Sequence, residues 1–194
     1  MDAHLVNVPV HPEQRGRRPQ PAAASDEAGT AAPPALGDYL DFMSAFPTGV
    51  AIVTTTGSAR RPYGLTCSSL ASVALNPPTL LVSLRVNKGG ALGVLLESGL
   101  FGVNLLHSGG RATAELMART APDRFARLAW GPSPRLGVPW LNDDTHAMAE
   151  CRLSNTLLVG DHTIVFGEVV SAVTNDGRPL LYGLRSFTAW PGQA

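Results

Sequence analysis

The chain has 194 residues, of which 44% are hydrophobic, and its 15 lysines and arginines balance its 15 aspartates and glutamates. This neutral balance gives no electrostatic reason to expect a nucleic-acid partner. Cys67 and Cys151 are far apart and form no CxxC motif, so no metal site is expected. No apolar run approaches the roughly 18 residues that cross a membrane, and the N-terminus lacks a signal pattern. We therefore expect a soluble, cytoplasmic protein that does not associate with membranes.

The composition changes near Gly37. Residues 1–37 contain six prolines, an alanine-rich stretch and no aromatic residue. Such a segment buries too little apolar surface to offset the cost of ordering its backbone, about 1–2 kcal/mol per residue. The sequence predicts a disordered Ala/Pro-rich tail over residues 1–37 and one folded domain over residues 38–194.

The first half of the folded region predicts short strands between short helices. A helix is expected over residues 38–46, where apolar side chains recur at helical spacing, and Pro47 ends it. A second helix is expected over residues 88–98, and Gly99 just after it suits a left-handed cap. Strands are expected over residues 48–56, 64–75, 79–86 and 100–106.

The second half predicts a helix over residues 112–120, an irregular stretch over 130–144 and an antiparallel meander. The strands of the meander are expected over residues 147–160, 161–174 and 179–184. Six or seven short strands joined by turns indicate an antiparallel barrel or sandwich and not a parallel doubly wound sheet. A barrel is favoured because closure removes the exposed edges of so many apolar strands.

Common nucleotide-binding and hydrolase motifs are missing from the sequence. It contains no GxGxxG, GxxxxGK[ST], HExxH or GxSxG pattern, so neither a Rossmann site nor a hydrolase or metal enzyme is supported. The first candidates for ligand binding are small residues with hydroxyl groups in one predicted strand, namely Thr66, Ser68, Ser69 and Ser72. They could donate hydrogen bonds to a carbonyl or phosphate of a ligand. An ordinary strand whose hydroxyl groups face solvent is the alternative.

Two further features could contact a ligand. Asn87-Lys88-Gly89-Gly90 precedes a predicted helix, whose free N–H groups would attract an anion, although a plain turn explains the same residues. His162 follows a Gly160-Asp161 turn between two apolar strands, and such a histidine is more often structural or on the surface.

Taken together and in this order, the motifs resemble the short-chain flavin reductases of two-component flavin-dependent monooxygenases, members of the split-barrel flavin-binding superfamily. The resemblance covers about residues 38–190. The motifs that carry it are FMSAFPTGVAIVTT (42–55), GLTCSSLASVALNPPTLLVSL (64–84), NK (87–88), FGVNLL (101–106), DRF (123–125), AEC (149–151), GDHTIVFGEV (160–169) and PLLY (179–182).

The resemblance implies a mainly β fold, a six-stranded antiparallel split β-barrel with short flanking helices. It also implies a homodimer with FMN or FAD bound near the subunit interface. The flavin ring is expected beside Thr48, Thr66, Cys67, Ser68, Ser69 and Ser72. The flavin phosphate is expected at Asn87, Lys88 and Gly89, with Phe101 and Asn104 in the same pocket. Because its neighbours are apolar, the Cys67 thiol is expected to be inert.

On the reductant side, the resemblance implies that His162 faces the nicotinamide and orients its amide, and that Phe187 covers this side. The implied reaction is hydride transfer from NADH or NADPH to FMN or FAD, which supplies diffusible reduced flavin to a partner monooxygenase. Such a reaction needs positioned cofactors more than a nucleophile or paired carboxylates. No arginine cluster in the sequence marks a 2′-phosphate site, which slightly favours NADH.

Two other functions remain possible at the level of sequence. A non-catalytic electron carrier or sensor of the same barrel class would hold its flavin tightly and would not oxidise NADH rapidly. An oxidase of the pyridoxamine phosphate type would need an arginine-rich phosphate site on the barrel, and the flavin segment offers none.

Overall fold

The computed structural model describes residues 34–86, 90–121 and 123–192, and from Leu36 onward the chain forms one compact unit. The tail expected over residues 1–37 lies almost entirely outside the described residues. The elements are α1 (Leu36–Ser44), β1 (Thr48–Gly49), β2 (Ala51–Thr56), η1 (Ser58–Arg60), β3 (Pro62–Cys67), β4 (Leu70–Leu75), β5 (Pro78–Arg85), α2 (Ala91–Ser98), β6 (Leu100–Leu106), α3 (Arg111–Ala118), η2 (Arg124–Arg127), β7 (Trp130–Pro132), β8 (Pro139–Leu141), β9 (Thr145–Val159), β10 (His162–Thr174), β11 (Leu180–Gly183) and β12 (Ser186–Ala189).

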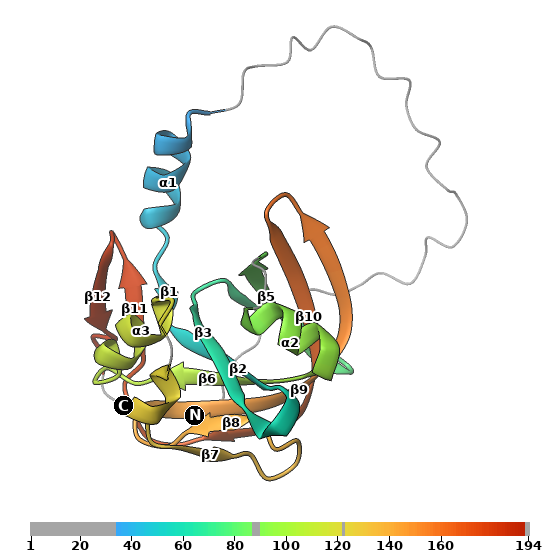
Figure 1. Ribbon diagram of the computed structural model, residues 1–194. Helices are drawn as coiled ribbons and strands as arrows, with labels where there is room; N and C mark the ends of the chain where they lie inside the picture. The colour runs from blue at the N-terminus through green and yellow to red at the C-terminus, as the bar shows by residue number, and fades with distance from the viewer. Residues whose placement is uncertain (1–33, 87–89, 122, 193–194) are drawn as a thin grey trace, which may run out of the picture. The chain divides into compact units, whose positions relative to one another are not determined.

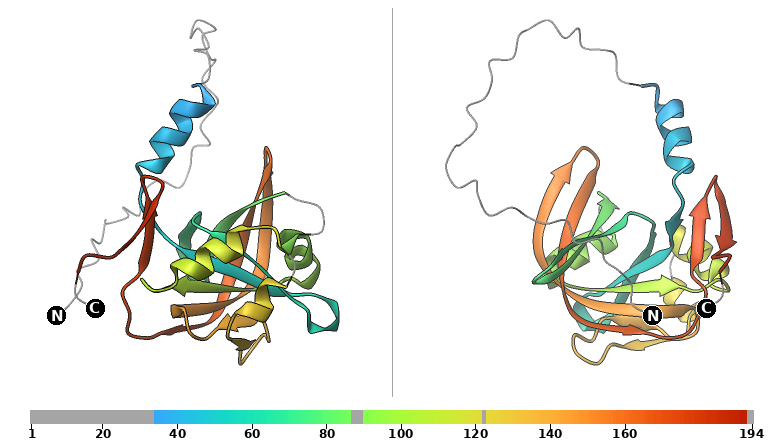
Figure 2. Two further views of the ribbon diagram at one scale, coloured as in Figure 1. Left: turned by 60° about the vertical axis from the view of Figure 1, so that its left-hand side comes forward. Right: turned by 180° about the vertical axis from the view of Figure 1, so that it is seen from behind.

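The main sheet is antiparallel and has the strand order β3-β2-β6-β9-β10-β5-β4 (Figure 1). Its two edge strands, β3 and β4, are consecutive in the chain and are separated only by Ser68 and Ser69. A link of this length spans at most about 10 Å, so the two edges of the sheet must approach each other. The sheet therefore curls on itself, as two further views show (Figure 2). It forms a barrel that stays open between β3 and β4, which confirms the predicted antiparallel split-barrel architecture.

The segment over residues 64–75, expected to be one strand, is divided into β3 and β4. β3 pairs with β2, whereas β4 pairs with β5 on the other side of the opening. Ser69 sits at the break, where its hydroxyl donates to the carbonyl of Ser83 at 2.8 Å and its carbonyl accepts from the Ser83 N–H at 3.2 Å. The change of partner strand at this serine gives the main sheet seven strands instead of the expected six.

The predicted meander is correct for β9 and β10 but wrong for its third strand. Both sides of β10 are already occupied, by β9 and by β5, so β11 has no free edge to join there. β11 pairs instead with β1 and β12 in a separate three-stranded sheet. Residues 130–144, expected to be irregular, contain the short β7–β8 hairpin.

Strand β2 is buried on both faces and separates two parts of the core. Ala51 and Val53 join a cluster inside the barrel, which also contains Phe101 and residues of β5, α2, β9 and β10. The intervening residue, Ile52, joins a second cluster beneath α3 that includes Met117. Because side chains alternate between the two faces of a strand, β2 holds the barrel on one side and α3 on the other.

A buried carboxylate organises the loop before the β8 strand. Glu150 is 0% exposed and accepts hydrogen bonds from the hydroxyl of Ser133 and from the N–H groups of Arg135 and Leu136. Burial, and then the charge of Glu150, raises the pKa of the neighbouring Cys151 thiol to about 12. The hydrogen bonds to the Glu150 carboxylate therefore stabilise the conformation of this loop.

Helix α2 ends as the sequence predicts. Gly99 follows it with a φ of 66°, and its N–H donates to the carbonyl of Leu95 at 2.9 Å.

Among the described residues, no helix is long and apolar enough to cross a membrane, and no group of side chains is arranged to hold a metal ion.

Gly167→Ala should destabilise the protein, because a Cβ at this position would lie 2.2 Å from Cζ of the buried Phe101. Overpacking of this kind costs about 1–3 kcal/mol, and thermal unfolding followed by circular dichroism would measure the lower Tm. Gly93→Ala on α2 is the matched control, since nothing lies within 4 Å of its added Cβ and alanine favours a helix by about 0.5–1 kcal/mol. Equal Tm values for the two variants would contradict the packing around Phe101.

Candidate functional site

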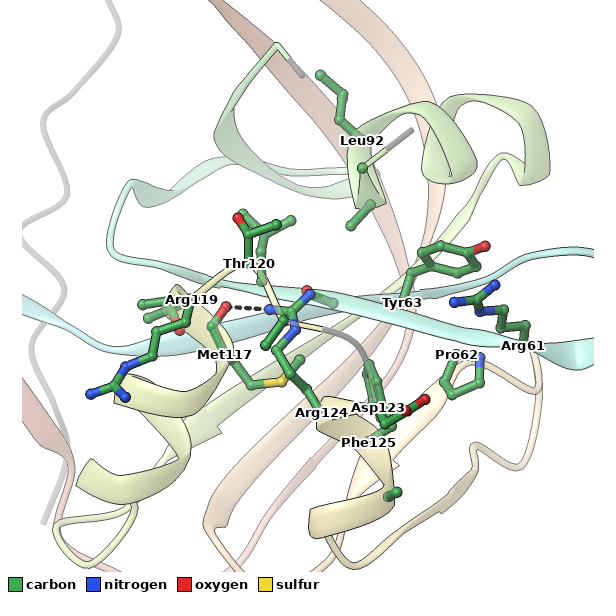
Figure 3. A pocket seen from close by; sticks show the side chains of 18 of the residues that line it. Arg61, Pro62, Tyr63, Leu92, Met117, Arg119, Thr120, Asp123, Arg124 and Phe125 are labelled. Carbon is green, nitrogen blue, oxygen red and sulfur yellow. Dashed lines mark hydrogen bonds between the residues drawn. The ribbon is translucent and has the colours of Figure 1, made fainter. Parts of the chain in front are cut away.

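Two cavities lie on either side of a wall made by β3 and α3. The first, of about 570 Å³, is bordered by β3, the start of α2, the end of α3 and η2 (Figure 3). The second, of about 400 Å³, is bordered by β3, α3, β11 and β12. The two cavities share Thr66, Ala118 and Arg119, so they are neighbouring compartments of one site.

The shared wall is fixed by hydrogen bonds to two adjacent residues of α3. Thr66 on β3 donates from its hydroxyl to the carbonyl of Ala114 at 2.7 Å, which ties the helix to the edge of the barrel. Thr113, on the same helix, donates to the carboxylate of Asp144 at 2.6 Å. These bonds link α3 to two separate parts of the chain and thereby set the width of both cavities.

The second cavity has the composition of a site for a planar ring. The aromatic rings of Tyr182 and Phe187 lie 4.9 Å apart between their centres, and the guanidinium of Arg111 lies 5.7 Å from the centre of the Phe187 ring. Thr66 and Ser68 bring hydroxyl groups to the same cavity. Its volume lies within the range of about 300–1,000 Å³ that is usual for small-ligand sites, so an aromatic ring with polar edges fits its lining.

The second cavity brings together Thr66 and Ser68, which are expected beside the flavin ring, and Phe187, which is expected on the nicotinamide side. Three other expected residues line neither cavity. Thr48 is half-buried and pairs with Tyr182 across β1 and β11, whereas Ser69 and Ser72 are exposed on the other side of the barrel opening. Contact of these side chains with flavin stays a prediction.

Cys67 lies in the barrel core and not at the surface of a cavity. Its side chain is 5% exposed, and burial raises the pKa of the thiol above its ordinary value. The neutral thiol is a poor nucleophile, which agrees with the inert character expected from the sequence.

Phe101 and Asn104 are both 0% exposed on β6 and line neither cavity. Phe101 packs in the barrel core. The amide of Asn104 donates to the carbonyl of Ile52 at 3.2 Å, and its oxygen accepts from the N–H of Leu141 at 3.0 Å. The polar groups of Asn104 are thus used to join β6 to β2 and β8, so this geometry favours a structural role over the ligand contact expected from the sequence.

His162 also lines neither cavity, although it is connected to the first one. Its Nδ1 lies 2.8 Å from Oδ1 of Asp161, and Oδ2 of Asp161 lies 3.5 Å from Nε of Arg85, which borders the first cavity. The hydrogen bond from His162 is the main reason why the pKa of Asp161 lies below its usual value. Because Nδ1 faces Asp161, the opposite ring nitrogen, Nε2, is the one left to face a ligand.

The expected phosphate-binding residues Asn87, Lys88 and Gly89 lie outside the described residues. Gly90, which follows them, borders the first cavity.

Sequence reasoning missed most of the first cavity. Arg124 belongs to the DRF motif, but its role does not follow from the motif: its guanidinium donates to the carbonyls of Met117 at 2.7 Å and Gly64 at 3.1 Å. Arg61 and Arg119, which border the same cavity from distant segments, were not predicted either. These arginines lie in different segments of the sequence, so no short stretch of sequence indicates that they border one cavity. Only the fold brings them together.

Comparison with known proteins agrees with the fold. The model of the flavin reductase-like domain matches residues 43–191. The chain is 48% identical over 153 residues to a flavin reductase (NADPH) from Lentzea aerocolonigenes, an alignment that covers 79% of this chain and 89% of the relative.

Two solved structures have a similar fold. One is nitrilotriacetate monooxygenase component B from Mycobacterium thermoresistibile, with a TM-score of 0.74, 31% identity and coverage of 79% of this chain and 86% of the other. The second is an NADH:FAD oxidoreductase from Streptomyces globisporus C-1027 in complex with NAD and FAD fragments, with a TM-score of 0.74, 29% identity and coverage of 81% and 94%. From the curled antiparallel sheet, the paired cavities and these matches, we conclude that the chain belongs to the flavin reductase-like domain family.

Proposed function

We propose that the protein is an NAD(P)H:flavin oxidoreductase that passes a hydride to FMN or FAD and releases the reduced flavin to a partner monooxygenase. The observation that carries the proposal is the second cavity, where an aromatic pair and two hydroxyl groups border a space suited to a planar ring. Family membership and the named activities of relatives support the same reaction.

In this proposal the protein binds and orients its two nucleotide substrates. Flavin supplies the hydride acceptor, so the reaction requires no protein nucleophile. Thr66 and Ser68 would bind the polar edge of the flavin ring, and Phe187 would cover one of its faces and exclude water from it. His162 would orient the nicotinamide amide through Nε2, while Asp161 holds the opposite nitrogen.

The proposed partner is a flavin-dependent monooxygenase, because one relative is named the reductase subunit of a flavin-dependent monooxygenase.

We also propose that two copies of the chain form a homodimer. None of the residues of α1 is buried within one chain, and Phe42 and Phe46 are 74% and 65% exposed, so a second copy would cover apolar surface. The same function places the protein in the cytoplasm, where reduced nicotinamide nucleotides are regenerated.

Oxidation of NADH or NADPH by the purified protein should depend on added FMN or FAD. The reason is that flavin is a substrate in this proposal and is released after each turnover. Absorbance at 340 nm would follow the reaction, with flavin-free and protein-free mixtures as controls. Absence of turnover with every combination of nucleotide and flavin would contradict the proposed function.

His162→Ala should raise the KM for NADH about five- to tenfold or slow flavin reduction to a similar extent, the effect expected from losing one positioning hydrogen bond. The dissociation constant for flavin should change less than twofold, because His162 does not border the second cavity. Steady-state kinetics and fluorescence titration would measure the two effects. His146→Ala is the control, since His146 borders neither cavity. Unchanged kinetics in His162→Ala would show that His162 does not orient the nicotinamide.

A further inference from the structure

Helix α3 carries an ion pair at the edge of the second cavity. Arg111 and Glu115 are four residues apart and therefore lie one turn apart on the same face of the helix. Nε of Arg111 donates a hydrogen bond to Oε1 of Glu115 at 2.8 Å. Glu115 borders the second cavity and is the one acidic residue among the described residues of its lining, whereas Arg111 does not border it. The carboxylate is thus the end of the pair that meets the cavity.

The positive charges near this cavity are more exposed to solvent than the carboxylate. The guanidinium of Arg111 lies 5.7 Å from the centre of the Phe187 ring, and its side chain is 65% exposed, against 40% for Glu115. Arg119 also borders the cavity, but it is exposed and follows the end of α3. Water screens an exposed charge more strongly than a half-buried one. Among the charged groups that border this cavity, the Glu115 carboxylate is therefore the one that solvent screens least.

The proposed reaction changes the charge of the flavin ring. A hydride consists of one proton and two electrons, so the nicotinamide becomes oxidised when its C4–H bond breaks, and the flavin ring gains one negative charge when the N5–H bond forms. A carboxylate at the edge of the ring site repels this anion but has no such effect on the neutral oxidised ring. The same side chain can therefore admit the substrate and disfavour the product.

We propose that Glu115 is a specificity-determining residue that distinguishes the two redox states of flavin. Its charge weakens the binding of the reduced, anionic ring relative to the oxidised, neutral ring, and so favours release of the product. Arg111 moderates this effect because it offsets part of the negative charge. The inference rests on the proposed function and deepens it, since it names the residue that promotes the release of reduced flavin.

The test uses Glu115→Gln and Arg111→Gln in the full-length protein. Both variants lose the same ion pair, so any loosening of α3 is common to them and acts on both redox states of flavin. The charge beside the cavity, however, changes in opposite directions. Glu97→Gln is the matched control, because Glu97 is an exposed glutamate on α2 that borders neither cavity.

The quantity to compare is the dissociation constant for reduced flavin divided by that for oxidised flavin. Fluorescence titration gives the constant for oxidised FMN or FAD, and anaerobic equilibrium dialysis gives that for dithionite-reduced flavin. Glu115→Gln should lower the ratio about three- to tenfold, the size expected for one unit charge close to the ring in a hydrated cavity. Arg111→Gln should raise the ratio about two- to threefold, and Glu97→Gln should match the wild type.

A potentiometric titration of bound flavin against an indicator dye measures the same effect independently. A tenfold lower ratio corresponds to a midpoint potential about 30 mV higher, because the couple transfers two electrons. Glu115→Gln should therefore raise the potential of the bound flavin, and Arg111→Gln should lower it.

An unchanged ratio in Glu115→Gln, or a change in the same direction in both variants, would overturn the inference and leave the ion pair with a role in helix stability alone. Because these measurements need no turnover, failure of the inference is distinguishable from failure of the proposed function. A protein that oxidises NAD(P)H normally, but whose ratio does not respond to Glu115→Gln, would contradict the inference alone. A protein whose ratio shifts as expected but which does not oxidise NAD(P)H would contradict the reductase function and keep the role of Glu115.

Discussion

Strand β2 is buried on both of its faces, and this burial positions the barrel and helix α3. Ala51 and Val53 pack into the barrel while Ile52 packs beneath α3, so one strand fixes the barrel wall and the helix that covers it. β3 pairs with β2 at the edge of the sheet, and Thr66 on β3 holds α3 by its hydrogen bond to Ala114. The two cavities are therefore a consequence of where β2 places α3 relative to the open edge of the barrel.

Much of the fold was predictable because local rules decide it. The apolar alternation of the strands, the left-handed cap at Gly99 and the turn at Gly160 were visible in the sequence, and the structure gives both glycines a positive φ. The division at Ser68-Ser69 was not visible, because a run of small hydroxyl residues continues the strand pattern through the break. The sequence predicted the wrong partner strand for β11, because local pairing rules do not reveal that β10 already pairs with a strand on each side.

The candidate site was predictable only in part. The second cavity is bordered by Thr66 and Ser68, which the resemblance implies beside the flavin ring, and by Phe187, which it implies on the nicotinamide side; their contact with flavin stays a prediction. Phe101 and Asn104 belong to the same family motif, yet β6 is buried on both faces and these side chains hold the barrel together. The arginines of the first cavity come from segments up to 63 residues apart in the chain, between Arg61 and Arg124, so no window of sequence reveals them.

Release of reduced flavin from the protein can be measured in an anaerobic dialysis cell. The protein, excess NADH or NADPH and several equivalents of flavin would be placed on one side of a membrane that retains only the protein. Reduced flavin should appear in the protein-free compartment in amounts that exceed one equivalent per protein. Reduced flavin that stays with the protein at no more than one equivalent would contradict it and indicate a carrier or sensor with bound flavin.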